Sequence, residues 1–258
     1  MDAGNSRIKW RLSRAGQTLD QGVVSTPDVA ALAQVWQRLG WEASCVSSVA
    51  GGEVNEFLRS LLATPAGGGP CGTGDAIQIH WVAAAARSHG IVSSYQPPET
   101  LGPDRYCALV AANRQQVAGS PQDWVVVNVG TALTADMLTA DGVFLGGVIL
   151  PGPDLMREAL ARGTARVIVE DAAVQTGWPV TTRAAVGQGI GWALWGGVAG
   201  MLETLGRETG RLPGVLLSGG ARAMLVPRFL AAGVELREID ELVLEGLAWI
   251  ARDQGLNA

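Results

Sequence analysis

The sequence predicts an α/β protein built from two lobes. Segments of strand length and helix length alternate along most of the 258 residues, as in folds whose helices cover a sheet. A glycine turn near the start of the chain recurs near its middle. Between them lies the polar, turn-rich segment Val117–Asp123, followed at once by a strongly apolar strand. We therefore predict an N-terminal lobe over residues 1–116 and a C-terminal lobe over residues 117–258.

In the first lobe, apolar residues alternate at Ile8, Trp10 and Leu12, which is typical of a strand. The strands are expected at residues 8–12, 22–25, 45–49 and 77–82, and the helices at 27–39, 53–62 and 103–115. A glycine-rich loop is expected at residues 65–74. Asp2 directly follows Met1, so the strand that should lead into the first turn is missing. We expect the natural start to lie a few apolar residues upstream.

The second lobe is predicted to open with a meander of three strands. These strands are expected at residues 124–130, 134–138 and 143–150, followed by a long amphipathic region at 183–207, a strand at 214–220 and a final helix at 241–252.

Composition excludes several classes of protein. With 48% hydrophobic and 17% charged residues, the chain is a packed globule rather than a disordered one. A net charge of −5 without clustered Lys and Arg argues against a nucleic-acid partner. The longest apolar stretch, Gly191–Leu202, is shorter than the roughly 18 residues of a membrane span. Three cysteines without CxxC spacing suit a reducing compartment, so we expect a cytoplasmic protein with no membrane partner.

The recurring turn has the chemistry of an anion site. Asp2-x-Gly4-Asn5-Ser6 is echoed by Asn128-x-Gly130-Thr131-Ala132, and both segments lie between expected strands. Glycine allows a close backbone approach, while exposed N–H groups and hydroxyl or amide side chains form an anion-binding concavity. Two such turns on duplicated lobes would face each other across a cleft. Each turn taken alone could also be an ordinary hairpin turn.

Two charged residues flank the first turn. Lys9 is the single lysine beside 18 arginines, and a compact ammonium suits a phosphate oxygen that a planar guanidinium does not fit. A leftover surface lysine is the alternative interpretation. Asp2 could hold Mg²⁺, which takes one or two carboxylates together with phosphate oxygens and water. Capping of the turn is the alternative for Asp2.

A third candidate lies in the segment Leu101–Arg105, LGPDR, at the start of an expected helix. Asp104 would have a favourable place at the helix N-terminus, and Arg105 gives it a charge partner. A kinase needs both a base for the attacking hydroxyl and a cation for an acidic substrate. The ordinary alternative is a plain N-terminal acid.

Taken together, these motifs resemble those of type III pantothenate kinases, including relatives called Bvg accessory factors. The resemblance runs through DAGNSRIK, YQPPETLGPDR, GTALT, GGVILPG and TTRAAV, and so covers nearly the whole chain. The family belongs to the superfamily of acetate and sugar kinases, heat-shock chaperone ATPases and actin. It implies two ribonuclease-H-like lobes, each a mixed sheet with flanking helices, in an actin-like kinase duplication.

The resemblance implies transfer of the ATP γ-phosphoryl group to the 4′-hydroxyl of pantothenate, the first step toward coenzyme A. It gives ATP and pantothenate as partners, Mg²⁺ and K⁺ or NH₄⁺ as cofactors, and a homodimer. Asp104 would be the general base and Asp2 would lie near Mg²⁺. The nucleotide phosphates would contact Asp2, Ala3, Gly4, Asn5, Ser6, Arg7, Ile8, Lys9, Gly130 and Thr131. Pantothenate would contact Tyr95, Gly102, Pro103, Asp104, Arg105 and Thr182, and Ser218–Gly220 would border the adenosine.

One departure from the family pattern concerns the monovalent cation. The family commonly has Asp where this chain has Asn128, and an amide oxygen lacks a full charge. We therefore expect this cation site to be weakened, displaced or absent. Asn128 also favours a rival function, a non-catalytic regulator that binds nucleotide or pantothenate. A kinase acting on another small hydroxylated acid is the second rival.

Overall fold

The computed structural model describes residues 1–39, 41–64, 77–116, 120–164 and 178–256, and it divides into two compact units. Unit 1 comprises Met1–Arg114 and Leu242–Ala258, while unit 2 comprises Gln115–Glu241. The first junction lies two residues from the predicted division after residue 116. The C-terminal helix α7 (Leu242–Asp253) differs from the prediction, because it packs on α3 and β4 of unit 1.

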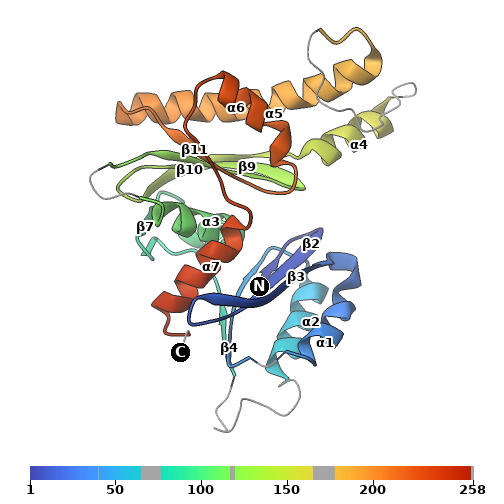
Figure 1. The fold of residues 1–258 in the computed structure, drawn as a ribbon, viewed down its shortest axis with the longest axis vertical. Coiled ribbons are helices and arrows are strands. Elements are labelled where there is room, and N and C mark those ends of the chain that lie inside the picture. The colour runs from blue at the N-terminus through green and yellow to red at the C-terminus, as the bar shows by residue number, and fades with distance from the viewer. Residues whose placement is uncertain (40, 65–76, 117–119, 165–177, 257–258) are drawn as a thin grey trace. The chain divides into compact units, whose positions relative to one another are not determined.

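Unit 1 contains a five-stranded sheet in the order β3-β2-β1-β4-β5 (Figure 1). Its strands are β1 (Asp2–Ala3), β2 (Arg7–Arg14), β3 (Gln17–Ser25), β4 (Ala43–Ser48) and β5 (Gln78–Trp81). The central strand, β1, runs antiparallel to β2 and parallel to β4. A short hairpin, β6 (Arg87–Ser88) with β7 (Ile91–Ser93), precedes residues 95–105, the segment predicted to contact the phosphoryl acceptor and called the acceptor segment.

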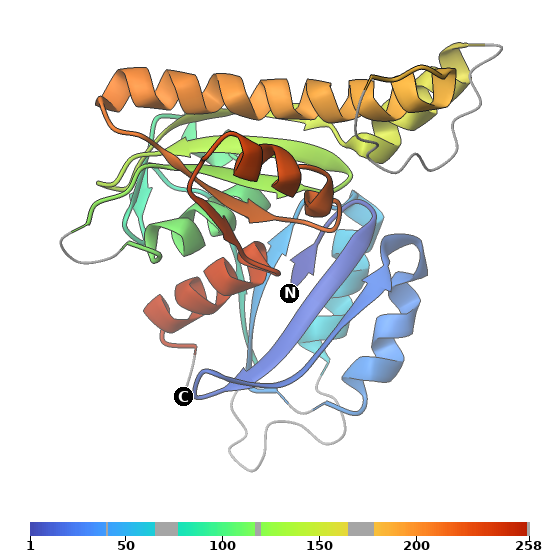
Figure 2. The ribbon, with the colours of Figure 1, turned by 45° about the horizontal axis from the view of Figure 1, so that its top comes forward.

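Helices cover both faces of the unit 1 sheet. On one face lie η1 (Thr26–Ala31), α1 (Leu32–Trp36) and α2 (Gly52–Ala63), which can be followed in Figure 2. Their apolar sides enclose a core with Ile8, Trp10 and Val46 from the strands. On the other face, α3 (Pro103–Asn113) and α7 pack on each other and on β4. Gly246 of α7 permits this packing, because a Cβ there would lie 1.9 Å from the Cys107 carbonyl oxygen of α3.

Unit 2 repeats the strand order of unit 1. Its strands are β8 (Trp124–Val129), β9 (Ala132–Leu138), β10 (Val143–Pro151), β11 (Gly214–Ser218) and β12 (Leu236–Glu238). They follow the order β10-β9-β8-β11-β12, and β8 runs antiparallel to β9 and parallel to β11. Each unit is thus a sheet of order 3-2-1-4-5 by position along its own chain segment. The predicted duplication of two α/β lobes is confirmed at the level of topology.

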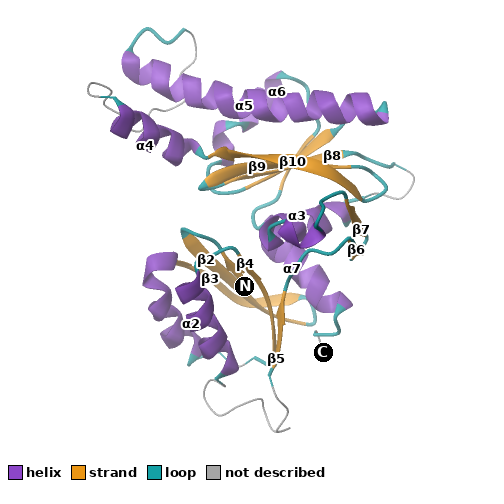
Figure 3. Ribbon diagram, turned by 180° about the vertical axis from the view of Figure 1, so that it is seen from behind, coloured by secondary structure: helices purple, strands orange, loops and turns teal. Residues whose placement is uncertain are grey.

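One face of the unit 2 sheet is covered by helices α5 (Thr182–Thr209) and α6 (Val226–Ala231), seen from behind in Figure 3. Along α5, Ile190, Leu194 and Val198 recur at helical spacing and bury against the strands. Each such side chain contributes about 1.5–3 kcal/mol through its burial. The helix begins at Thr181, whose hydroxyl accepts a hydrogen bond from the Ala184 N–H, and ends at Gly210 in the left-handed conformation.

Several elements were not predicted from the sequence. These are β6, β7, η2 (Pro98–Thr100), α4 (Pro153–Gly163), η3 (Arg222–Met224), α6 and β12, together with β1 at Asp2–Ala3, which corrects the expectation that the strand leading into the first turn is missing. Most are two to six residues long, so they show too few periods to detect. The expected strands at 22–25 and 45–49 are observed as β3 and β4 with shifted ends. The expected glycine-rich loop, Pro65–Gly74, lies outside the described residues.

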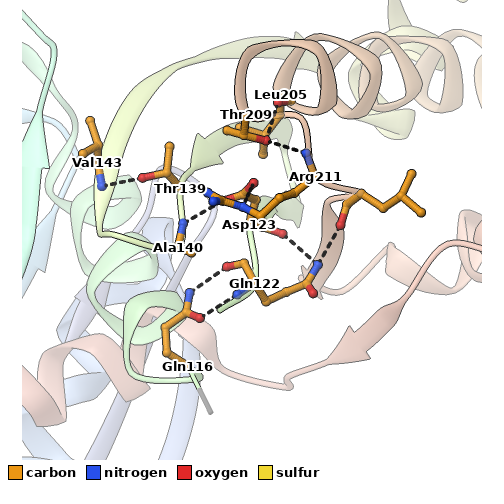
Figure 4. A network of polar contacts seen from close by, with 10 residues as sticks. Gln116, Gln122, Asp123, Thr139, Ala140, Val143, Leu205, Thr209 and Arg211 are labelled. Carbon is orange, nitrogen blue, oxygen red and sulfur yellow. Dashed lines mark hydrogen bonds and ion pairs between the residues drawn. The ribbon is translucent and has the colours of Figure 1, made fainter. Parts of the chain in front are cut away.

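A polar network ties the start of β8 to two distant connections of unit 2 (Figure 4). The buried Asp123 carboxylate accepts hydrogen bonds from Arg211 Nε at 2.8 Å, Arg211 Nη2 at 2.6 Å and the Ala140 N–H at 2.7 Å. Burial acts to raise the pKa of Asp123, but the hydrogen bonds from Arg211 and its neighbours outweigh it and hold the pKa below its usual value. The network therefore fixes this end of the sheet.

Replacing Gly246 by Ala should destabilise unit 1, since the new methyl group would collide with the α3 backbone. Overpacking of this kind costs about 1–3 kcal/mol, which lowers Tm by several degrees. The matched control is Gly196→Ala in α5, where a Cβ meets nothing within 4 Å. That change should leave Tm unchanged or raise it slightly. Thermal unfolding monitored by circular dichroism gives the Tm of each variant. Equal Tm values for the two variants would contradict the packing described.

Candidate phosphate and acceptor sites

The first glycine turn joins β1 to β2 and is held in place by the start of η1. The Gly4 N–H donates to the Arg7 carbonyl oxygen at 3.0 Å, which closes the turn. The buried Thr26 donates its hydroxyl to the Gly4 carbonyl at 2.9 Å and its N–H to the Ser6 carbonyl at 3.0 Å. Asn5, Ser6 and Arg7 remain exposed. The turn therefore presents polar groups from a backbone that its neighbours fix.

Asp2 and Lys9 lie directly opposite each other across the β1–β2 ladder. Directly opposed residues in an antiparallel pair have Cβ atoms about 4.5–5.5 Å apart on the same face of the sheet. Asp2 is also in register with Ser47 on β4. Both Asp2 and Lys9 are half-buried. The first unit thus places a carboxylate and the chain's one ammonium side chain together, immediately beside the glycine turn.

The acceptor segment converges on Arg105. Arg105 Nη1 donates to the Tyr95 hydroxyl at 3.0 Å, and its guanidinium lies 5.5 Å from the centre of the Tyr95 ring. Only 7% of Arg105 is exposed, although it is a charged residue at the first turn of α3. Burial of an arginine is costly unless its charge is compensated. The contacts with Tyr95 hold this guanidinium in place beside the start of α3.

Asp104 occupies the N-terminal turn of α3, between Gly102 and Arg105. Its Oδ1 accepts a hydrogen bond from the Arg105 N–H at 2.8 Å. Gly102 leaves room for this carboxylate, because a Cβ on that residue would lie 2.7 Å from Oδ1. Within the described part of the chain, Oδ2 has no hydrogen-bond partner. One carboxylate oxygen is therefore fixed and the other can accept a proton.

Asp2 and Asp104 both lie near one buried thiol. Burial raises the pKa of Cys107 well above its usual value, and the negative charges of Cys45, Asp2 and Asp104 raise it further. Burial likewise raises the pKa of Cys45 to about 11. Both thiols are therefore unreactive side chains of the core. Unit 1 contains two pairs of predicted residues, Asp2 opposite Lys9 on the sheet and Asp104 beside Arg105 at the start of α3.

The second glycine turn, Asn128–Thr131, joins β8 to β9 in unit 2. The Gly130 N–H donates to the Ala132 carbonyl at 2.9 Å, so this turn is tighter than that of unit 1. Gly130 and Thr131 are exposed, as an anion site requires. Asn128 is in register with Ser218 of β11 and Thr134 of β9. It occupies the place that Asp2 holds between β4 and β2 in unit 1.

Two further glycines pack against this second turn: Gly152, which the sequence-based site omits, and Gly219, which was predicted to border the adenosine. The Gly152 N–H donates to the Thr131 carbonyl at 2.9 Å, and a Cβ there would lie 2.2 Å from the Gly130 carbonyl oxygen. Gly219, at φ +98°, would place a Cβ 2.6 Å from Asn128 Oδ1. Gly152 also caps α4, and a helix N-terminus favours anions. The sequence signal that could have indicated this helix start is Gly152-Pro153, because Pro is common in the first turn of a helix.

Thr182, the last predicted acceptor residue, is the exposed first residue of α5 in unit 2. Among the described residues, no three His, Cys, Asp or Glu side chains are grouped to hold a metal ion. Within the described residues, no helix has the length and hydropathy needed to cross a membrane.

Solved structures share the fold described. A protein described as a Baf family transcriptional activator from Campylobacter jejuni aligns with a TM-score of 0.60 at 16% identity, covering 99% of this chain and 98% of that one. One described as a 2-dehydro-3-deoxygalactonokinase from Sinorhizobium meliloti gives 0.56 at 15% identity, covering 98% and 97%. The duplicated sheets with their glycine turns thus define an actin-like kinase fold.

Within that fold, the chain belongs to the type III pantothenate kinase family. Residues 1–204 match the family. The type III pantothenate kinase of Nitrosomonas eutropha is 37% identical over 257 residues, covering 98% of this chain and 93% of the relative. That of Chromobacterium violaceum is 37% identical over 252 residues, covering 97% and 98%. The resemblance identified from the sequence motifs is confirmed.

Replacing Gly152 by Ala should displace the Gly130–Thr131 turn, since the added methyl group would overlap two backbone carbonyl oxygens. If this turn contacts ATP phosphates, the affinity for ATP should fall at least tenfold, or about 1.4 kcal/mol. The control is Gly163→Ala at the other end of α4, where a Cβ meets nothing within 4 Å. Calorimetric titration with ATP measures both variants. An unchanged Kd for Gly152→Ala in a folded protein would remove this turn from the nucleotide site.

Proposed function

We propose that this protein transfers the γ-phosphoryl group of ATP to the 4′-hydroxyl of pantothenate, the first step of coenzyme A synthesis. The observation that supports this most strongly is the acceptor segment in unit 1. There a partner-free carboxylate oxygen of Asp104 and a buried, tyrosine-bound guanidinium of Arg105 start the same helix. A hydroxylated acid needs this combination, a proton acceptor for its alcohol and a cation for its carboxylate.

In the proposed reaction, the pantothenate hydroxyl oxygen attacks the γ-phosphorus and the bond from that phosphorus to the bridging oxygen breaks. ADP leaves, and the hydroxyl proton passes to Asp104 Oδ2. The positions of the reactants contribute more to the rate than the base does, because phosphoryl transfer proceeds through a loose transition state. Arg105, with Tyr95, would orient the substrate carboxylate. Gly102, Pro103 and Thr182 would also contact the substrate.

We further propose that both glycine turns bind ATP phosphates. In unit 1 the binding residues would be Asp2, Ala3, Gly4, Asn5, Ser6, Arg7, Ile8 and Lys9. Lys9 would neutralise a phosphate oxygen as a point charge. Asp2 fits Mg²⁺, since its carboxylate lies beside the turn and the described residues offer no all-protein cage. Bound there, Mg²⁺ would neutralise charge on the phosphates. In unit 2 the phosphate-binding residues would be Gly130 and Thr131.

A cytoplasmic homodimer remains part of the proposal, as does a monovalent cation, K⁺ or NH₄⁺, whose binding Asn128 weakens. A non-catalytic regulator is the competing function, and Asn128 is the residue that favours it. Asp2, Lys9, Asp104 and Arg105 favour the enzyme, because a pure binding protein has no need of an acid and a cation together. Phosphorylation of pantothenate by the purified protein decides between them: no product with any monovalent cation would favour the regulator.

Replacing Asp104 by Asn should lower kcat by at least 10²-fold, since a general base contributes on the order of 10²- to 10⁴-fold. The Kd for ATP and the circular dichroism spectrum should not change. Asp154→Asn is the matched control, because Gly152-Pro153-Asp154 starts α4 as Gly102-Pro103-Asp104 starts α3. The control tests for any general effect of removing an acid at a helix N-terminus. Equal kcat values in the two variants would exclude Asp104 as the base.

The role of Asn128 is tested by titrating activity with K⁺ at constant ionic strength. The native protein should respond weakly, because an amide oxygen attracts a cation less than a carboxylate does. Asn128→Asp should steepen the response and lower the K⁺ concentration needed for half-maximal activity. A sharp K⁺ dependence of the native protein, unaltered in Asn128→Asp, is the result that would contradict this role.

A further inference from the structure

Thr26 holds in unit 1 the position that Gly152 holds in unit 2. Thr26 directly follows β3 and Gly152 directly follows β10, and a proline comes after each of them. The Thr26 N–H donates to the carbonyl of Ser6, the residue before β2, at 3.0 Å. The Gly152 N–H donates to the carbonyl of Thr131, the residue before β9, at 2.9 Å. The same backbone hydrogen bond therefore holds both glycine turns.

The two positions differ in their side chains. The Thr26 hydroxyl donates to the Gly4 carbonyl at 2.9 Å. In unit 2 a side chain would collide with the turn, since a Cβ on Gly152 would lie 2.2 Å from the Gly130 carbonyl oxygen. This difference follows from turn length, because three residues separate β1 from β2 whereas two separate β8 from β9. The longer turn of unit 1 leaves room for the threonine and gains a second hydrogen bond from it.

The two hydrogen bonds from Thr26 set the direction of two peptide groups. A trans peptide group is planar, so its C=O and the N–H of the next residue point in opposite directions. The Gly4 and Ser6 carbonyls point to Thr26, and the N–H groups of Asn5 and Arg7 therefore point away from it. Thr26 is 7% exposed, whereas Asn5 and Arg7 are exposed. The carbonyls thus face the interior, and the two donors face away from it.

This orientation decides whether the turn attracts or repels an anion. Phosphate oxygens accept hydrogen bonds from N–H groups and are repelled by carbonyl oxygens. Without the Thr26 hydroxyl, the Gly4 carbonyl loses its partner. The peptide group between Gly4 and Asn5 can then rotate, because glycine has access to backbone conformations that other residues avoid. Rotation would turn a carbonyl oxygen toward the place of the donor.

We propose that Thr26 is a positioning residue for the phosphates of ATP. It does not touch the nucleotide. Its hydroxyl holds the Gly4–Asn5 peptide group so that the Asn5 N–H is presented to a phosphate oxygen, while its own N–H does the same for the Arg7 N–H. This role rests on the proposed function and deepens it, since it makes the affinity for the triphosphate, and not for adenosine, depend on Thr26.

The test compares Thr26→Val with Thr26→Ser in the full chain. Valine has nearly the shape of threonine but no donor, whereas serine keeps the hydroxyl. Calorimetric titration with Mg²⁺ present gives the Kd for ATP, for inorganic triphosphate and for adenosine. Thr26→Val should raise the first two at least tenfold and leave the third unchanged. Thr26→Ser should keep all three within about twofold of the native values.

Thr204→Val is the matched control, because it also removes a hydroxyl that donates to a backbone carbonyl, that of Gly200 in α5. It should alter none of the three Kd values. If circular dichroism shows that Thr26→Val does not fold, Thr26→Ala removes the same donor and takes its place. An equal loss of affinity for adenosine, or an equal loss in Thr26→Ser, would show a general structural role and overturn the proposal.

The outcome for Thr26 is separable from that for the proposed function. A native protein that phosphorylates pantothenate, while folded Thr26→Val binds ATP as tightly as the native protein does, would reject the role of Thr26 alone. A native protein that binds neither ATP nor inorganic triphosphate would reject the proposed function, and the role of Thr26 with it.

Discussion

Each candidate phosphate turn is positioned by a strand that is hydrogen-bonded on both sides. β1 lies between β2 and β4, and β8 lies between β9 and β11. A strand paired on both edges cannot shift in register without breaking two ladders, because a slip of one residue moves every side chain to the other face. The turn at its end is therefore fixed relative to the sheet. Preorganised donors of this kind contribute to catalysis because they need no rearrangement during the reaction.

The same reasoning explains why small residues surround the turns. The residue that follows β10 and the turn after β11 lie very close to the backbone of the second glycine turn. A side chain at either contact point would collide with that turn. Gly152 and Gly219 are the points of closest approach, and the hydrogen bond from Gly152 to Thr131 depends on that approach. Around the first turn the support comes instead from Thr26, whose hydroxyl donates to the Gly4 carbonyl and whose backbone N–H donates to the Ser6 carbonyl. The duplicated turns thus have different supports, although their strands share one topology.

Elements with a long periodic pattern were predictable from the sequence. The β8 and α5 segments are of this kind, because each buries a continuous or regularly spaced apolar set. The packing of the C-terminal helix α7 in unit 1 was not predictable, because the apolar face of a helix can pack on either of the two sheets. In the candidate site, Asp2, Lys9, Asp104 and Arg105 could be found from motifs. Gly152 could not be assigned to it, and the contact of Gly219 with Asn128 could not be foreseen, because both glycines are distant in sequence from the Asn128–Thr131 turn.

The two turns also differ in charge, and this difference has a physical consequence. Asp2 has a lysine directly across the ladder, whereas Asn128 is paired with Thr134 and Ser218, which are neutral. A carboxylate near phosphate oxygens is favourable only when a cation lies between the like charges. An amide at Asn128 avoids that repulsion without needing a cation.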